Sequence, residues 1–455
     1  MPRQDALPTQ GPIEASSSRQ ACAGFIILGG LLWQILLFTG APLSPLPVGY
    51  ALWLAVLLLW RDIPTRTRRQ AGILAGLGLG MLLVASLYYH AEIAWPRMLH
   101  GNTYVVAMLV GVSFISLIGP ARPQRRTING RRGTASTWLS VHLLGAILNL
   151  STVFMVGDRL KALSQAGQRD QAQPSLSEPQ LLALNRGLSS AAFWSPFFAS
   201  MGVVMSLAPQ MDFAWILAFG LPLGALSGVL TSFELGRRFD LSMTPGFAMS
   251  PGNLLMPIVM AALVMLFHYG LTPELTIVSI ITFLLPAAAL ITNLPRGVAW
   301  TRRRLLNHTR QRLPGMRGEL TLFLAAGLFT LGLSGLIDSA TGGEWVLFAH
   351  FGATEATLSY VAIVLSALAG LHPIIGVSIL ASMLDLEGSR YTLLAFVSLA
   401  SWAVGTSVGP LSGINLSLQG RYGISGYRTM RLNAPYALVM SLAVVAAIAL
   451  LDQLL

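Results

Sequence analysis

The sequence predicts an all-α polytopic membrane protein with about 11 transmembrane helices plus two oppositely oriented re-entrant hairpins in an inverted repeat. Three observations predict this fold class. The composition is strongly apolar, apolar runs of bilayer-spanning length recur along the whole chain, and the basic residues are distributed in a way that fits one topology.

The composition excludes several classes of protein. Of the 455 residues, 54% are hydrophobic and only 10% are charged, and a water-soluble domain of this size could not bury so much apolar surface. The net charge of +11 does not indicate nucleic-acid binding, because the basic residues lie in short loops between apolar runs. The single cysteine, Cys22, excludes an internal disulfide and a cysteine-based metal site.

The apolar runs give the order of the expected helices. Residues 1–20 are polar and predict a cytoplasmic N-terminal tail, and the segment 21–46 contains a first helix outside the repeat. Membrane spans are expected at 21–39, 47–60, 72–90, 103–119, 188–208, 213–233, 251–268, 274–293, 318–337, 391–412 and 433–452. There are two further apolar stretches, 136–158 and 354–385. Whether each of them crosses the membrane is decided by the distribution of basic residues.

The positions of lysine and arginine decide between two topologies. If 136–158 and 354–385 both cross the membrane, the basic residues divide almost equally between its two sides. If each stretch instead enters and leaves on one side, the cytoplasmic side receives the N-terminus and the loops around 61–69, 122–132, 159–186, 237–238, 296–317 and 421–431. Only Arg97 and Arg390 then lie outside, which is the bias that orients membrane proteins. The two stretches are therefore predicted to be re-entrant hairpins.

Re-entrant hairpins imply a polar pocket near the middle of the membrane. A helix that stops inside hydrocarbon leaves terminal N–H and C=O groups without partners, which costs several kcal/mol per group when they face lipid. Such backbone is tolerated only inside protein or beside a water-filled cavity. Two hairpins of opposite orientation therefore predict a binding cavity between them.

A helix with a proline near its middle follows each hairpin. Pro196 lies in a Ser-rich stretch and Pro410 in a stretch rich in Gly, Ser and Thr, so both helices are expected to be broken. The hairpin 136–158 and the broken helix 188–208 belong to a first repeat, 47–240. The hairpin 354–385 and the broken helix 391–412 belong to a second repeat, 241–455. Two such units are the layout of inverted-repeat transporters.

Two short segments resemble a known family. The segment Asn149-Leu150-Ser151-Thr152 resembles the Ser-Asn-Thr hairpin tip of the ion transporter superfamily, which includes divalent anion/sodium symporters and arsenite-type permeases, although the order differs. The run from Ala403 to Pro410, followed by Asn415, is similar to the second broken helix of that superfamily. The resemblance implies an inverted-repeat carrier and, as a candidate assembly, a homodimer.

Polar residues at the tips and breaks are the candidate substrate contacts. They are Asn149, Ser151, Thr152, Ser189, Ser190, Trp194, Ser195, His372, Thr406, Ser407, Ser412 and Asn415. Free amides at half-helix N-termini attract anions, while carbonyls and hydroxyls coordinate sodium. The alternative is that these side chains only join helices, that Trp194 only packs, and that His372 is a structural histidine.

No metal or cofactor is expected apart from a coupling ion. A coupling Na⁺ is a candidate near Asn149, Ser151, Thr406 and Asn415, and His372 is a candidate carrier of a coupling proton. No acidic residue is expected in the middle of a span, which favours an anion site over a cation exchanger. The basic segment 300–312 is expected to lie on the cytoplasmic leaflet, held by anionic membrane lipid.

These observations favour a secondary active transporter for a small anion, an organic acid or an oxyanion, over an enzyme. It is expected in the bacterial cytoplasmic (inner) membrane as a multi-pass protein with its N-terminus inside and its C-terminus outside. Two alternatives stay open. One is a membrane-embedded enzyme acting on a lipid or lipid-linked substrate. The other is a channel or a membrane subunit of a larger assembly.

Overall fold

The computed structural model describes residues 18–118, 128–166, 176–249, 252–342 and 346–455. Most of the predicted tail 1–20, and parts of the loops expected around 122–132 and 159–187, lie outside these residues. The described chain is almost entirely helical. The strands in it are β1 (Ile128–Asn129) and β2 (Pro245–Gly246), which form one short antiparallel pair.

Eight helical segments of the described chain are long and apolar enough to cross a membrane. They are Ser18–Phe38, Thr65–Leu87, Trp95–Leu117, Phe213–Arg238, Ile277–Arg296, Arg317–Thr341, Arg390–Tyr422 and Gly426–Leu454. The chain is therefore an all-α polytopic membrane protein. Three of the expected spans do not reach this length: helices of 14 and 15 residues occupy 47–60 and 251–268, and the helix at 188–208 is interrupted.

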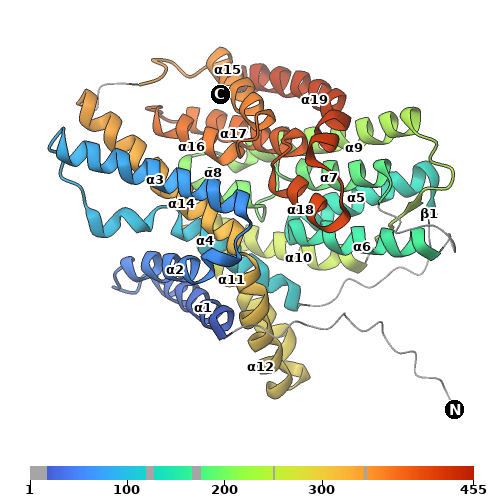
Figure 1. Ribbon diagram of the computed structural model, residues 1–455, viewed down its shortest axis with the longest axis horizontal. Helices are drawn as coiled ribbons and strands as arrows, with labels where there is room; N and C mark the ends of the chain where they lie inside the picture. Colours follow the sequence, from blue (N-terminus) through green and yellow to red (C-terminus); the bar gives the residue numbers. More distant parts are fainter. Residues whose placement is uncertain (1–17, 119–127, 167–175, 250–251, 343–345) are drawn as a thin grey trace.

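The helices form two groups, which we call the frame and the core bundle (Figure 1). The frame comprises α1 (Ser18–Phe38), α2 (Leu46–Leu59), α3 (Thr65–Leu87), α4 (Thr103–Ser113), α10 (Gly252–Leu266), α11 (Ile277–Asn293), α12 (Val298–Asn307), α13 (Leu313–Gly315) and α14 (Arg317–Thr341). The core bundle comprises α5 (Gly130–Leu148), α6 (Leu150–Ala166), α7 (Glu178–Ala191), α8 (Ala199–Leu207), α9 (Phe213–Arg238), α15 (Ala353–Leu368), α16 (Pro373–Ser382), α17 (Arg390–Val408), α18 (Gly413–Tyr422) and α19 (Gly426–Leu454). Each half of the chain thus contributes first to the frame and then to the core bundle.

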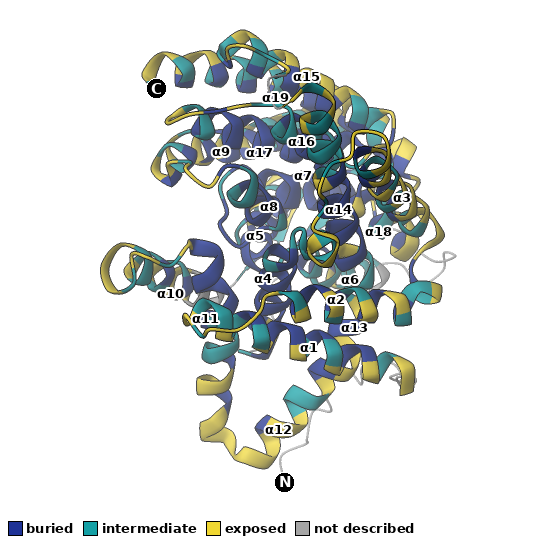
Figure 2. Ribbon diagram, turned by 90° about the vertical axis from the view of Figure 1, so that its left-hand side faces the viewer, coloured by how far each residue is buried: buried dark blue, intermediate teal, exposed yellow. Residues whose placement is uncertain are grey.

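Burial follows this division (Figure 2). Helix α17 is buried at every position from Thr392 to Val408, so it forms the centre of the core bundle. Helix α12 in the frame has one buried residue, Thr301, and its Arg302 and Arg303 are exposed. A helix that is apolar on all sides belongs inside a large protein, whereas a helix with a charged face belongs at an interface.

Two helix–turn–helix units occur where the hairpins were expected. Helices α5 and α6 meet at Asn149, whose φ of +52° ends α5 and reverses the chain. Both arms contact β2 at their far end, so they run side by side. Helices α15 and α16 are joined by a turn containing Gly370, with φ +98°, and His372 caps α16 by accepting a hydrogen bond from the Ile374 amide at 3.2 Å. That each unit enters and leaves the membrane on one side stays a prediction.

The frame is held together by a close contact between glycines of α3 and α14. A Cβ atom on Gly332 would lie 2.2 Å from the Gly78 carbonyl oxygen, so only a residue without a side chain allows this approach. Small residues let helices pack closely in membranes, where packing rather than water exclusion drives association.

We expect Gly332→Ala to destabilise the protein by about 2 kcal/mol, because the new methyl group must push two backbones apart. Gly335→Ala, one turn further along α14, is the matched control, since its Cβ would meet only Leu82 Cδ2 at an ordinary 3.6 Å. Thermal unfolding of both variants in one detergent measures the difference. Equal stability of the two variants would contradict the predicted contact.

Candidate functional site

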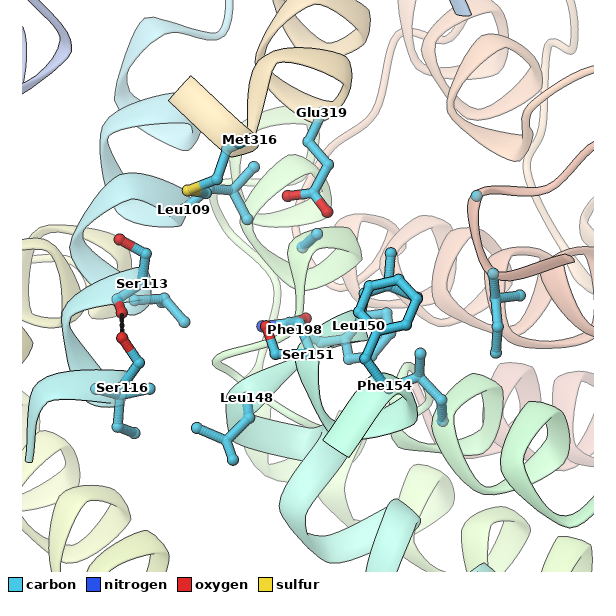
Figure 3. A pocket seen from close by; sticks show the side chains of 18 of the residues that line it. Leu109, Ser113, Ser116, Leu148, Leu150, Ser151, Phe154, Phe198, Met316 and Glu319 are labelled. Carbon is cyan, nitrogen blue, oxygen red and sulfur yellow. Dashed lines mark hydrogen bonds between the residues drawn. The ribbon is translucent and has the colours of Figure 1, made fainter. Parts of the chain in front are cut away.

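A cavity of about 320 Å³ lies at the boundary between the frame and the core bundle. Its volume falls within the range of small-molecule binding sites, which is about 300–1,000 Å³. It is lined by Leu109, Val112, Ser113, Ile115, Ser116, Leu148, Asn149, Leu150, Ser151, Phe154, Leu188, Ser189, Phe198, Ala199, Gln311, Arg312, Gly315, Met316, Glu319, Phe323, His372, Trp402, Thr406, Gly413 and Ile414. The tip of α5–α6, the break between α7 and α8, and the break between α17 and α18 therefore meet at one place. Figure 3 shows the tip residues beside Phe198 of the first break.

The α5–α6 tip holds an unsatisfied acceptor in a residue that lines the cavity. The Asn149 side-chain amide donates to the carbonyl oxygens of Phe197 at 3.1 Å and Ile147 at 3.3 Å, which fixes the tip to the first helix break. Its Oδ1 atom is buried and has no hydrogen-bond partner among the described residues, and neither does Thr152 Oγ1. Because an unmatched buried acceptor is costly, Asn149 Oδ1 is suited to a cation or to an N–H group.

At the first helix break, one of the predicted contacts lines the cavity and three do not. Ser189 lines it, whereas Ser190 and Trp194 bind His142 on α5, at 2.9 Å to Nδ1 and 3.1 Å to Nε2. The Ser195 hydroxyl donates to the Ala146 carbonyl oxygen. These three side chains join α5 to the break, as in the alternative interpretation of the sequence.

The second helix break is satisfied by its own side chains. Thr406 lines the cavity and donates to the Trp402 carbonyl oxygen at 2.8 Å. Ser412 Oγ donates to the Thr406 carbonyl oxygen at 2.8 Å, and Asn415 Nδ2 donates to the Gly409 carbonyl oxygen at 2.9 Å. Ser407, Ser412 and Asn415 therefore stabilise the break from outside the cavity lining.

His372 lines the cavity from the α15–α16 turn and has a structural role there. Its Nδ1 accepts the Ile374 amide, which places the proton of the neutral ring on Nε2. The ring packs edge-on against Trp402, with 5.1 Å between ring centroids. The cap and the ring contact give His372 a structural role that does not require the ring to gain or lose a proton.

A buried polar network behind the two breaks was missed by the sequence analysis. Arg186 was expected in a cytoplasmic loop, but this was wrong: it lies in α7 and is completely buried. Its Nε donates to Asn433 Oδ1 at 2.7 Å and its Nη1 to Glu234 Oε2 at 2.8 Å. Asn433 continues the network to Asn185, which donates to Asn415 Oδ1 at 2.8 Å.

Local capping explains why Arg186 lies so deep. Ser177 and Gln180 form a capping box, and Pro179 lies in the first turn, so α7 begins about ten residues before the apolar run at 188. The Ser-Glu-Pro-Gln sequence is the signal that could have located this helix start. The buried position of this one arginine does not change the predicted excess of the remaining basic residues on the cytoplasmic side.

Two charged residues of the frame also line the cavity and were not predicted. Arg312 donates to Ser151 Oγ on the α5–α6 tip, and Glu319 lies in the first turn of α14. The Glu319 carboxylate extends into the cavity from above Phe198 and Ser151 (Figure 3). No acidic residue was expected in the middle of a span, and Glu319 lies in the first turn of α14 and not in its middle; that it lines the cavity was not predicted. The expected span 318–337 contains Glu319 next to its start, but an apolar run does not show where a side chain extends.

His308 lies in the same basic segment as Arg312 and carries no charge at pH 7. Burial, together with the positive charges of Arg312 and Arg304, lowers the pKa of His308 to about 4, so this ring is neutral at pH 7. His308 Nε2 lies 3.0 Å from Ser113 Oγ, which lines the cavity. Among the described residues there is no group of three or more His, Cys, Asp or Glu side chains that could hold a metal ion.

Comparison with known proteins gives a distant structural likeness to a transporter. No family model matches the chain, and no curated protein matches it. A solved structure of the YdaH transporter of Alcanivorax borkumensis, described as having an unusual topology, is 15% identical over 96% of this chain and 98% of that one. The TM-score is 0.40.

Proposed function

We propose that the protein is a secondary active transporter that moves a small organic anion across the bacterial cytoplasmic membrane by alternating access, coupled to an ion gradient or to exchange. The observation that carries the proposal is the cavity between the frame and the core bundle, where a helix–turn–helix tip and two interrupted helices meet. Interrupted helices at a cavity expose backbone groups and side chains to a solute, as in inverted-repeat carriers.

The position of the cavity supports movement between two helix groups. Its walls come from α4, α13 and α14 of the frame and from the α5–α6 tip, α7, α17 and α18 of the core bundle. A displacement of one group against the other would therefore carry the cavity between the two sides of the membrane. In this mechanism Asn149 Oδ1, the unsatisfied acceptor at the tip, is the candidate contact for a coupling cation.

Reconstitution tests the proposed transport. Purified full-length protein in liposomes should take up a labelled carboxylate only when an ion gradient or an internal counter-solute is imposed. Conversion of the solute, rather than its movement, would indicate an enzyme. Absence of movement for every carboxylate and oxyanion in folded protein would contradict the proposal.

We expect Asn149→Gly to lower uptake about tenfold, because it removes the amide that contacts the cavity while glycine keeps the positive φ of the tip without strain. Asn102→Gly is the matched control, since Asn102 also has a positive φ, +59°, but does not line the cavity. The measurement is the initial uptake rate per folded protein. Equal rates for both variants would remove Asn149 from the proposed site.

A further inference from the structure

The cavity contains one positive and one negative side chain that do not form an ion pair with each other. Arg312 and Glu319 are the two residues of opposite formal charge in its lining, and no ion pair joins them among the described residues. The Arg312 guanidinium contacts the Ser151 hydroxyl instead. Each charge therefore faces the cavity with capacity to bind a ligand.

Glu319 lies in the first turn of α14, where its charge stabilises the helix dipole, and this role uses neither carboxylate oxygen in a hydrogen bond. The Glu319 carboxylate accepts no hydrogen bond from any described residue, and it points away from α14 into the cavity (Figure 3). Glu319 is exposed to the open space of the cavity, so its carboxylate is accessible to a positively charged or N–H donor group of a solute.

Arg312 offers the complementary chemistry. A guanidinium group has five N–H donors in a planar fork, so its contact with Ser151 leaves donors for a carboxylate. The charges of Arg312 and Glu319 sum to zero. A solute with a single negative charge would therefore be attracted by Arg312 and repelled by Glu319. A solute that carries both charges would satisfy both groups at once.

The rest of the lining is mainly apolar. Leu109, Leu150, Phe154, Phe198, Phe323 and Ile414 line the same cavity as the two charges. Apolar walls with a few convergent polar groups bind the body of a solute by burial and fix its orientation by the charges.

We propose that the transported solute is a zwitterion with an apolar body, such as an apolar amino acid or a short peptide, whose ammonium group binds Glu319 and whose carboxylate binds Arg312. This inference rests on the proposed transport function; it keeps the carboxylate of the proposed solute and adds an ammonium group, so that the solute carries no net charge. Glu319 thus selects the substrate.

Matched ligands test this selection on the full-length protein in detergent and in liposomes. The probes are L-phenylalanine, 3-phenylpropanoate, which lacks the amino group, and phenethylamine, which lacks the carboxylate. Leucine and leucyl-leucine, with their deaminated and decarboxylated analogues, form further sets. We expect at least one zwitterion to bind about tenfold or more tightly than both of its analogues, since each analogue leaves one charge in the cavity unmatched.

Glu319→Gln gives the second arm of the test. This variant should weaken binding of the zwitterion and strengthen binding of its deaminated analogue, so that the preference falls to about threefold or less. Glu274→Gln, an exposed carboxylate outside the cavity, is the matched control and should keep the preference.

The outcomes separate this inference from the proposed function. Transport of a simple carboxylate that exceeds its amino-bearing counterpart, with no response to Glu319→Gln, overturns the zwitterion and leaves the anion transporter standing. If Glu319→Gln removes dependence on an ion gradient but leaves the ligand preference intact, Glu319 binds a coupling ion and the inference is also overturned. Binding of no solute by folded protein contradicts both proposals.

Discussion

Glu234→Ala should lower the free energy of unfolding by about 3 kcal/mol, because it leaves the Arg186 guanidinium charged and buried without its counter-ion. The Arg186 side chain is 0% exposed, so little water surrounds the guanidinium to compensate for the lost carboxylate. Its remaining contacts are the Asn433 amide oxygen and the Tyr436 ring, whose centroid lies 4.4 Å from the guanidinium carbon. The shift is measured by thermal or denaturant unfolding in a fixed detergent.

The surface pair between Glu178 and Arg428 provides the matched control. There the arginine side chain is 66% exposed, and Glu178→Ala should cost about 1 kcal/mol or less. Combining Glu234→Ala with Arg186→Met should recover part of the loss, since the uncompensated charge is then removed as well. Equal destabilisation by the two glutamate variants would show that burial of Arg186 does not determine its energetics.

Arg312→Gln should weaken binding of a carboxylate-bearing solute about 10- to 100-fold. A hydrogen bond to a charged group contributes about 1.5–3 kcal/mol, which corresponds to this change in dissociation constant. Since Arg312 also contacts Ser151, its loss could alter the α5–α6 tip in addition. The decisive measurement is therefore the ratio of dissociation constants for 3-phenylpropanoate and 3-phenylpropanol in each variant.

A purely structural role of Arg312 would weaken binding of both compounds equally and leave that ratio unchanged, which would contradict the assigned contact. Arg302→Gln is the control, because Arg302 is an exposed arginine of α12 outside the cavity lining. It should leave the ratio and both dissociation constants unchanged. Arg312→Lys should restore part of the preference for the carboxylate, since it keeps the charge but not the planar fork.

Local features of the sequence predicted much of the fold. Apolar runs near 20 residues long specify membrane helices wherever they occur, because the hydrocarbon core rejects unpaired backbone groups. Proline removes a backbone donor whatever its surroundings, so Pro196 and Pro410 indicated where helices stop, and α7 and α17 end before them. The tip at Asn149 was likewise indicated by polar residues inside an apolar run.

The direction of each side chain could not be predicted in the same way. Ser189 and Ser190 are neighbours, yet one lines the cavity and the other binds His142 on α5. Adjacent positions on a helix face different sides, and the choice between them depends on which other helices pack there.

The sequence by itself determined that this chain is an α-helical membrane protein with interrupted helices, because hydropathy, proline and charge act over one helix length or one loop. Only the tertiary structure decided which polar groups share a cavity: Arg312 meets Ser151 across 161 positions of the chain, and Asn185 meets Asn415 across 230. The depth of Arg186 and the direction of Glu319 belong to the same category. Contacts between residues so far apart in the sequence depend on how separate helices pack, and the periodicity of a single helix does not predict them.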